Sequence, residues 1–409
     1  MKRYRVAVVG GGAAGLLAAV TAARALKKQN IPGGVVLLEG NPRPGKKLLA
    51  TGNGRCNLTN LHISPEHYHG DVEAAAPLLG SYPARRILAK FEELGLLCRA
   101  DSEGRVYPNS LQAAAVLQTL WSACEEAGVE LRWGFAVSQI EKEADHFQLT
   151  DTGGETISAG RCILASGGRA SPRHSCQSSG YELAKALGHS VTPLIPALTP
   201  LKTSAKLCKA LKGIRCKARV SLWEEGKKLG EESGEVIFGD GQISGICVFD
   251  LSSLLTAAPA ELRLDLLEQW SGEKLFAYWN ALQQNRPALP AAQLFSGLLH
   301  LRVGQELTKL AGLPGDKKIS ELHRQDFQKA LETAKNLRLP VTGLGSWESA
   351  QVTSGGVPLS ELDTGTMESK RCSGLHLAGE LLNINGDCGG YNLHWAWLTA
   401  MAAGESAAR

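Results

Sequence analysis

A glycine-rich bend between an apolar strand and a helix, close to the N-terminus, constrains the fold most. Residues 4–9 are apolar and rich in β-branched side chains, which predicts a buried strand. Residues 10–15 fit the GxGxxG pattern, and residues 13–28 have the pattern of a helix. A second apolar strand follows at 35–38 and ends at Glu39. Strand, glycine turn, helix, strand and terminal acid in this order predict a βαβ dinucleotide-binding unit.

Each glycine of this bend has its own physical task. Gly10 makes the tight turn, Gly12 lets a pyrophosphate approach the main chain, and Gly15 allows close packing of the helix on the strand. The helix N-terminus offers N–H groups and a positive dipole end to the phosphates. Glu39 is placed to accept ribose hydroxyls, and its charge disfavours the 2′-phosphate of NADP. These residues alone leave NAD and FAD open.

The composition is typical of a soluble globular protein with more than one domain. The chain has 409 residues, 44% of them hydrophobic and 21% charged, which at about 100–200 residues per domain predicts about two or three domains. The 10 cysteines are scattered without a CxxC pair, which favours a reducing, cytoplasmic location and argues against a metal site. The apolar run 6–23 imitates a signal peptide or membrane span, but its clustered glycines argue against both.

A second glycine-rich segment follows the acid almost directly. Residues 45–60 are basic, polar and glycine-rich, with a Thr-Gly-Asn-Gly-Arg-Cys-Asn run at their centre. Lys47 and Arg55 can neutralise phosphate, while Gly52 and Gly54 let the main chain pass close to a flat ring or a pyrophosphate. We therefore expect this segment to form a second part of the nucleotide site.

These motifs resemble those of one bacterial flavoprotein family. Residues 45–60 match the GxKLLxTGNGRCNLTN pattern of the BaiN-like, YhiN-like and aminoacetone-oxidase-like FAD-dependent oxidoreductases almost without change. Further matches lie at 104–108, 165–168 and 352–357, and the strongest C-terminal matches lie at 374–380 and 385–397. The blocks span the whole chain in the family's order, so the chain is identified as a member of this family.

The resemblance implies an α/β protein that binds FAD rather than NAD. The fold it implies is a glutathione-reductase-type Rossmann FAD-binding domain with an inserted β-barrel and helical subdomain. Beside Gly10, Gly12, Gly15 and Glu39, it implies cofactor contacts along the matched blocks. These positions are Ala14, Lys47, Thr51, Gly54, Arg55, Cys56, Asn57, Val137, Ser166, Gly167, Gly379, Glu380, Asp387, Gly389, Gly390, Tyr391 and Asn392.

The C-terminal block also has a physical interpretation of its own. Residues 375–378 are apolar and predict a strand that ends at Glu380, which by resemblance lies near the ribityl chain. Gly389 and Gly390 precede an apolar helix that starts at Tyr391. The N–H groups at its start would stabilise the negative charge of a reduced flavin by about 1–2 kcal/mol.

The middle of the chain differs in composition and predicts an insertion. The expected division is 1–188 for the first part of the FAD-binding domain, 189–255 for a barrel, 256–338 for a helical cap, and 339–409 for the return through the barrel and the C-terminal part of the FAD-binding domain. Within the insertion, the pattern predicts β segments at 215–224 and 235–251, and helices at 261–285, 291–311 and 320–336. Residues 175–181 and 239–245 depart from the family's pattern, which bears on the substrate rather than on FAD.

The expected activity is reduction of a conjugated or pyrimidine C=C bond, with NAD(P)H as a transient electron donor. Flavin supplies the hydride, and a side chain protonates the neighbouring carbon. Candidates for that acid are Tyr107, Asp240, Tyr391 and Asp387. Amine oxidation by O2 remains an alternative, and a flavin sensor without turnover ranks last because no output domain is visible.

A second alternative is a ribosomal RNA uridine reductase that forms dihydrouridine. The net charge of +4 is too small to indicate nucleic-acid binding by itself. Residues 183–223, however, contain no Asp or Glu. Within them, lysines at near-helical intervals would form one basic face for phosphates. These lysines are Lys202, Lys206, Lys209 and Lys212. A solvated lysine face without a nucleic-acid partner is the competing interpretation.

Overall fold

The computed structural model describes residues 3–174, 180–255 and 258–409. The chain divides into two compact units, one formed by Met1–Pro196 with Ala350–Arg409 and the other by Ala197–Ser349. The segment 175–179, part of a departure from the family's pattern, lies outside the described residues. Among the described residues, no helix combines the length and apolar character needed to cross a bilayer.

The first unit is built on a twisted, largely parallel sheet. In the described part of the chain the strand order is β19-β20-β21-β10-β1-β2-β7, and β8 and β9 extend it as an antiparallel meander on β10. Its strands are β1 (Arg3–Val9), β2 (Val35–Glu39), β7 (Glu130–Trp133), β8 (Val137–Lys142), β9 (Phe147–Asp151), β10 (Thr156–Leu164), β19 (Leu362–Asp363), β20 (Glu368–Ser369) and β21 (Leu375–Leu377). The smaller strands are β3 (Thr59–Asn60), β4 (Tyr68–Gly70), β5 (Cys98–Ala100), β6 (Arg105–Pro108), β11 (Ile195–Ala197), β18 (Val352–Ser354) and β22 (Ile384–Gly386).

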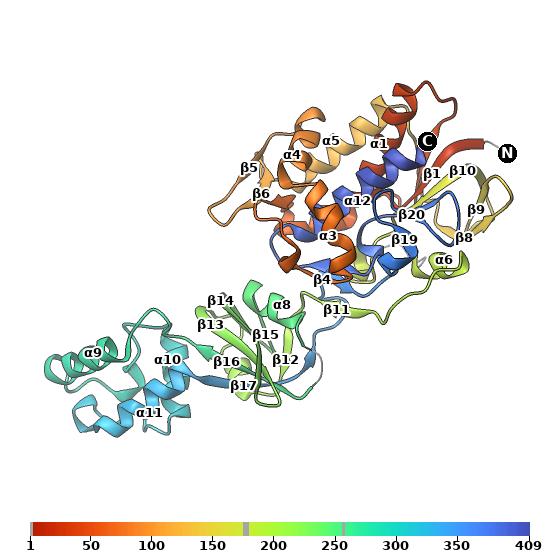
Figure 1. The fold of residues 1–409 in the computed structure, drawn as a ribbon. Helices are drawn as coiled ribbons and strands as arrows, with labels where there is room; N and C mark the ends of the chain where they lie inside the picture. The colour runs from red at the N-terminus through yellow and green to blue at the C-terminus, as the bar shows by residue number, and fades with distance from the viewer. Residues whose placement is uncertain (1–2, 175–179, 256–257) are drawn as a thin grey trace. The chain divides into compact units, whose positions relative to one another are not determined.

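Two long apolar helices pack side by side in this unit. Figure 1 shows α12 (Tyr391–Ala407) lying along α1 (Ala13–Lys28), and both helices bury most of their residues. Small residues allow the close approach: a Cβ at Gly404 would lie 2.7 Å from the carbonyl oxygen of Ala18. The other helices are α2 (Lys46–Ala50), α3 (Val72–Ser81), α4 (Ala84–Glu93), α5 (Ala113–Glu126) and α6 (Gly180–Ala186). This packing fixes the starts of α1 and α12 against the same sheet.

The second unit combines a closed barrel with a helical part. The barrel order is β12-β15-β14-β13-β16-β17, with β12 (Leu201–Thr203), β13 (Arg215–Glu224), β14 (Lys227–Gly239), β15 (Gln242–Ser244), β16 (Ala260–Asp265) and β17 (Leu337–Leu344). Its helices are α7 (Lys206–Ala210), α8 (Ile246–Ser252), α9 (Gly272–Asn285), α10 (Leu301–Leu310) and α11 (Arg324–Lys335). In Figure 1, α9, α10 and α11 group together beyond the barrel strands.

Two segments of this unit differ from the sequence-based expectation. Residues 260–265 form β16 rather than the start of a helix, because burial alternates along Ala260–Asp265 and places Leu262 and Leu264 inside the barrel. Residues 246–252 form α8 rather than a strand. Its buried positions Cys247, Val248 and Leu251 follow a helical spacing after the turn at Gly245.

The first boundary between the units lies further along the chain than the expected division at 188/189. Residues 189–196 bond to the first unit: the His189 imidazole contacts Glu361, and Thr192 donates from its main chain to the carbonyl of Gly356. β11 pairs with β18 of the same unit. At the other boundary, β17 completes the barrel and continues to Leu344.

Candidate functional site

The turn between β1 and α1 forms an open cradle. Gly10 has a φ of 110°, which disfavours other residues, and a Cβ at Gly15 would clash with the carbonyl of Gly10. At Gly12 a Cβ would meet nothing within 4 Å, so its main chain faces open space. The start of α1 has no side-chain cap and no acidic residue in its first turn. Its N–H groups and positive dipole end are thus available to an anion.

Glu39 lies at the end of β2 and next to this turn. Its carboxylate accepts from the Gly11 N–H at 2.7 Å and from the Asn41 N–H at 2.7 Å, and it is 8% exposed. Its carbonyl accepts from the main chain of Phe135 at 3.0 Å. This bond holds the segment that precedes β8 next to the main chain of Glu39, and the buried Val137 begins β8 two residues later.

A lysine–glutamate pair joins the second motif to the C-terminal block. Lys47 Nζ lies 2.6 Å from Glu380 Oε2, and both side chains are largely shielded from solvent. Glu380 Oε1 accepts from the Thr353 N–H at 3.0 Å. The Thr353 hydroxyl in turn accepts from the main chain of Arg169 and Ala170. Residues from three distant segments are therefore fixed around Glu380, and the sequence analysis did not single out Thr353.

The loop after α2 turns back sharply beneath this pair. Gly52 and Asn53 are in the left-handed region, and the Thr51 hydroxyl donates to the carbonyl of Leu48 at 2.6 Å. Cys56 is fully buried, and burial raises the pKa of its thiol to about 12, so it stays protonated. It is thus a poor nucleophile or redox thiol.

Arg55 extends from the same loop across the ring of Tyr107. Its guanidinium carbon lies 5.1 Å from the ring centroid. Tyr107 is buried on β6, and burial raises the pKa of its hydroxyl, although the charges of Arg105 and Arg55 oppose this shift. The phenol therefore stays protonated at neutral pH.

The start of α12 rests on this loop. Gly390 has a φ of 103°, and a Cβ there would lie 2.5 Å from the carbonyl group of Thr59 and 2.8 Å from Asn57 Oδ1. Asn60 Nδ2 donates to the Gly389 carbonyl at 3.0 Å. The helix has neither a side-chain cap nor an acid in its first turn. The second motif thus presents an uncapped helix start, as α1 does.

Glycines and small residues line the connection between these two helix starts. A Cβ at Gly379 would lie 3.0 Å from the Ala14 Cβ, which places the end of β21 against the first turn of α1. At Gly167 there is open space around a would-be Cβ. Asn392 holds the turn before α12, since its Oδ1 accepts from the Gly386 N–H at 2.8 Å.

A histidine–aspartate cluster, formed by His67, His69 and Asp387, lies beside the start of α12. Asp387 Oδ2 is 3.2 Å from His67 Nδ1, and Asp387 Oδ1 is 2.8 Å from His69 Nε2. The His67 ring stacks on Tyr391 with centroids 4.4 Å apart, and Tyr68 meets Tyr391 edge-on. His69 lies on β4 and His67 directly precedes that strand; β4 pairs with β22, which leads to Asp387. Sequence analysis missed both histidines.

Asp240 lies in the second unit, in the turn between β14 and β15. Its carboxylate is 3.6 Å from Lys212 Nζ, and both side chains are more than half exposed. The predicted helical lysine face is wrong: α7 spans only Lys206–Ala210, Lys202 belongs to β12, and Lys212 follows the helix. The β-strand forms because Leu201 pairs with both β15 and β17 in the barrel.

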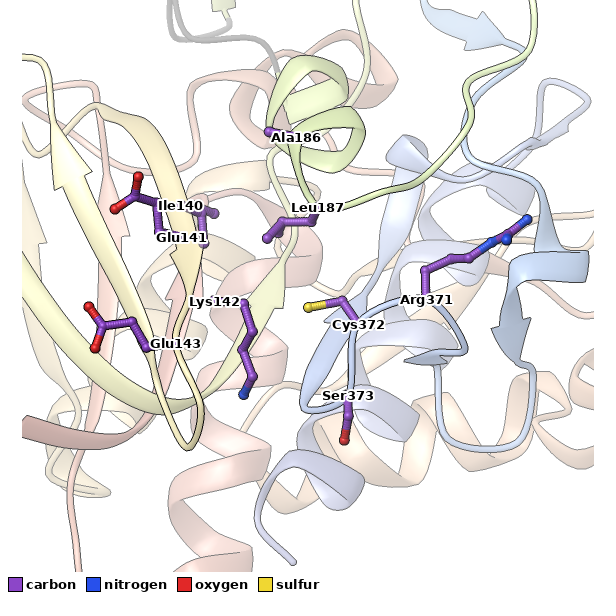
Figure 2. Close-up of a pocket in the computed structure, with 9 residues that line it drawn as sticks. All are labelled: Ile140, Glu141, Lys142, Glu143, Ala186, Leu187, Arg371, Cys372 and Ser373. Atoms are coloured by element: carbon purple, nitrogen blue, oxygen red, sulfur yellow. The ribbon is translucent and has the colours of Figure 1, made fainter.

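A surface pocket of about 690 Å³ lies near the amino end of β21, whereas the glycine turn and the two helix starts lie near its carboxyl end (Figure 2). Cys372 and its neighbours precede the amino end of β21, whereas Glu380 follows its carboxyl end. Figure 2 shows Glu141 and Glu143 pointing away from Cys372, and Lys142 lies 4.2 Å from the Phe147 ring. This pocket is therefore separate from the glycine turn and the two helix starts.

The residues around the helix starts fit a large polar cofactor. Ser166 Oγ, Asn57 Oδ1 and both amide atoms of Asn385 are buried without a hydrogen-bond partner in the described part of the chain. Buried polar atoms are normally satisfied, so such orphans point to a bound group. Two uncapped helix starts, a ribose-type acid in Glu39 and open main chain at Gly12 match the pyrophosphate, sugar and ring of a dinucleotide.

Comparison with known proteins agrees with this geometry. The family described as HI0933-like protein Rossmann domain matches residues 4–406. The chain belongs to this family. Among the curated relatives of this chain, the 3-dehydro-bile acid delta(4,6)-reductase of Clostridium scindens is 34% identical to it over 410 residues, covering 99% of both chains. The ribosomal RNA dihydrouridine synthase of Escherichia coli is 28% identical over 413 residues, covering 99% of this chain and 98% of the relative.

Solved structures show the same fold for this HI0933-like protein. A 3-ketosteroid delta1-dehydrogenase from Sterolibacterium denitrificans covers 100% of both chains with a TM-score of 0.52 and 13% identity. A flavocytochrome c3 fumarate reductase covers 100% of this chain and 78% of its own, with a TM-score of 0.51 and 16% identity. The chain is an FAD-dependent oxidoreductase with a Rossmann-type FAD-binding domain and an inserted closed barrel.

Proposed function

We propose that this flavoprotein reduces a conjugated C=C bond of a small organic molecule, of the α,β-unsaturated carbonyl class. The observation that carries the proposal is the full-length similarity, at 34% identity, to a protein named as a bile acid delta(4,6)-reductase. The polar cradle around the starts of α1 and α12 supports it, since hydride transfer to carbon requires a cofactor held in a fixed position.

Different residues of the cradle would hold different parts of the cofactor. The start of α1, with Gly12 and Ala14, would hold the pyrophosphate, and Glu39 would hold the adenosine ribose. Lys47 and Glu380 form a pair that would bind the polyol chain between the two helix starts. The start of α12 would stabilise negative charge on the ring system by about 1–2 kcal/mol.

In this reaction the protein would position the substrate against the flavin and supply a proton. The bound flavin supplies a hydride for one carbon of the double bond. The neighbouring carbon takes a proton, so the C=C π bond is replaced by two C–H bonds. Tyr107, Tyr391 and Asp387 are the sequence-predicted acids in the flavin-binding unit, and the two tyrosines are buried. We take NAD(P)H as the electron donor. A cytoplasmic location fits the nine cysteines of the described residues, all of which are free thiols.

Anaerobic reduction followed by rapid mixing tests this function. The FAD-loaded protein is photoreduced and mixed with an enone, with uridine-containing RNA, with an amine-oxidase assay mixture containing O2, or with buffer. We expect rapid flavin reoxidation by the enone and slow reoxidation by O2. Rapid reoxidation by O2, with an enone that has no effect, would instead favour an oxidase, and reduction of the oxidised flavin by an amine would then identify the amine-oxidase alternative.

Reduction of uridine in ribosomal RNA is the second candidate. It is favoured by a set of lysines in the second unit whose side chains are exposed. Of these, Lys202, Lys206 and Lys209 form no ion pair within 4 Å in the described residues, while Lys212 forms an ion pair with Asp240. Cations without protein partners are available to phosphates. The Escherichia coli relative named as a ribosomal RNA dihydrouridine synthase supports the same candidate.

Charge reversal tests the RNA candidate directly. Lys206, Lys209 and Lys212 are changed to Glu together, and retention of ribosomal RNA is measured at low and high salt. The matched control changes Lys274, Lys309 and Lys329, which are exposed on helices of the same unit, and so alters the net charge equally. RNA reduction predicts loss of retention in the first variant only. Equal retention in both variants would remove this candidate and leave the small-molecule reductase.

A further inference from the structure

The histidine–aspartate cluster places two imidazoles on one carboxylate. Each oxygen of Asp387 faces one ring nitrogen, Nδ1 of His67 at 3.2 Å and Nε2 of His69 at 2.8 Å. A carboxylate accepts hydrogen bonds only, so both facing nitrogens carry protons. The remaining nitrogens, Nε2 of His67 and Nδ1 of His69, are where each imidazole gains or loses a proton. Asp387 therefore fixes which atom of each ring does the chemistry.

The cluster lies where solvent and the cofactor site meet. The side chains of His67, His69 and Asp387 are 32%, 27% and 23% exposed, so water can exchange protons with them. His67 also stacks on Tyr391, the first residue of α12. The Asn392 side chain, on the next residue, donates to the carbonyl of Asp387 at 3.3 Å. One face of the cluster thus contacts the helix start that fits the cofactor ring, and the other reaches water.

Glu66 and Tyr68 are further titratable groups next to the cluster. Glu66 Oε1 lies 4.0 Å from His67 Nε2, on a side chain that is 80% exposed. Burial raises the pKa of Tyr68 well above its usual range, so that phenol stays neutral. Its hydroxyl donates to the Tyr391 carbonyl at 3.1 Å. Among the described residues, no group of three His, Cys, Asp or Glu is arranged to hold a metal ion.

We infer that His67 delivers the proton of the reductive reaction from its Nε2, with Asp387 and His69 as positioning residues. This role rests on the proposed C=C reduction. The imidazolium of His67 loses one proton to the carbon next to the one that receives the hydride, and becomes a neutral ring. Water then restores the proton. Asp387 stabilises the charged ring before transfer and holds its Nδ1–H, while His69 secures the other oxygen of the same carboxylate.

A spectroscopic test examines the cluster without turnover. Ring-nitrogen NMR of the unreduced protein is expected to show a proton on Nδ1 of His67 and a proton on Nε2 of His69, the two nitrogens that face Asp387. Asp387→Asn offers one acceptor and one donor in place of two acceptors, so one imidazole must switch tautomer. Unchanged tautomers in Asp387→Asn would overturn the assignment of Asp387 as the residue that fixes the two rings.

A kinetic test separates proton delivery from structural support. His67→Phe keeps a ring to stack on Tyr391 but cannot donate a proton, and His67→Gln removes both properties. Both variants are expected to bind FAD and to accept electrons from the donor as the wild type does. Their enone-driven reoxidation should fall about 100-fold or more. The wild-type rate should decline as pH rises because the imidazolium is lost, and this pH dependence should disappear in both variants.

The outcomes separate this role from the proposed function. His146→Gln is the matched control, because His146 also contacts carboxylates, those of Glu143 and Asp145, in the turn between β8 and β9. It should retain the wild-type rate. A wild type that reduces the enone while His67→Phe and His67→Gln keep its rate and pH profile would overturn the role of His67 alone. A wild type that reduces no C=C acceptor would overturn the proposed function and this role with it.

Discussion

Two of the places where the flavin-binding unit pairs imidazole with carboxylate differ in their access to water. In the histidine–aspartate cluster, all three side chains are between 23% and 32% exposed. The second place is a glutamate–histidine cluster formed by His189, Glu361 and Ser369, where the imidazole is 0% and the carboxylate 8% exposed. The same chemical groups can thus either exchange protons with solvent or be sealed from it.

The hydrogen bonds of the glutamate–histidine cluster explain why we assign it a structural role. His189 Nδ1 lies 2.7 Å from Glu361 Oε2, and its Nε2 lies 2.8 Å from Ser369 Oγ. The order serine, histidine, acid is that of a hydrolytic triad. Ser369 Oγ, however, also accepts from two main-chain N–H groups of the next loop and is buried. A serine held in this way anchors β20 to the segment after α6, and no substrate reaches it.

The largest expected difference between the clusters is in stability. Glu361→Leu leaves the buried His189 ring N–H without its acceptor, and it also removes the acceptor of the N–H and hydroxyl of the exposed Ser190. We expect a loss of about 3 kcal/mol in the free energy of unfolding. Asp387→Leu should cost less than about 1 kcal/mol, because water can solvate both imidazoles. Urea unfolding at neutral pH measures both values, and equal losses would contradict the contrast.

The second expected difference is in activity, and its direction is the reverse. Asp387→Asn should slow enone-driven flavin reoxidation by about 10-fold to 100-fold, since the imidazolium of His67 loses its counter-charge. Glu361→Gln should leave that rate unchanged while it lowers the melting temperature. Stopped-flow kinetics and thermal unfolding of the same two preparations provide the measurements. A Glu361→Gln protein that is slow but fully stable would mean that the glutamate–histidine cluster takes part in the reaction, contrary to this prediction.

The flavin-binding unit was the easier part to predict from the sequence. Its fold follows from motifs that a dinucleotide imposes on the main chain: Gly10 must adopt a positive φ, and Gly15 must admit the Gly10 carbonyl. Such demands leave a fixed spacing in the sequence. The strand and helix at 4–9 and 13–28 were predicted to within a residue of the observed β1 and α1.

The second unit and the histidine–aspartate cluster were harder for physical reasons. The barrel strand β16 has only six residues, and apolar side chains at Leu262 and Leu264 also fit a helical pattern that continues into α9. Its partner β17 lies 73–81 residues later along the paired positions, so local periodicity cannot detect it. His67 and His69 were missed because Asp387, the carboxylate that both imidazoles contact, is 318–320 residues away in the sequence.

A third and smaller difference is in the pH dependence of stability. Burial alone would raise the pKa of Glu361 above its ordinary value of 4.5, but hydrogen bonds from Ser190 and His189 outweigh burial and lower it. The unfolded chain therefore binds this proton at a higher pH than the folded protein. The carboxylate's contribution is complete above pH 4.5 and is lost as pH falls through the folded value.

Urea unfolding of the wild type and Glu361→Gln between pH 7 and pH 3 tests this sign. The difference in free energy between the two proteins should stay constant down to about pH 5 and then shrink by about 1 kcal/mol. A difference that grows on acidification would mean that the carboxylate is held protonated in the folded protein.

The smallest expected effect concerns Arg371, an exposed cation that contacts the glutamate–histidine cluster. Arg371 lies 3.5 Å from Glu361 Oε1, but its side chain is 58% exposed. An ion pair with one partner in water contributes little, so Arg371→Ala should cost about 0.5 kcal/mol or less, and 1 M salt should erase the loss. A loss close to that of Glu361→Leu would show that charge pairing, rather than buried hydrogen bonds, holds the cluster together. The contrast with the histidine–aspartate cluster would then lie in the partner charge and not in access to water.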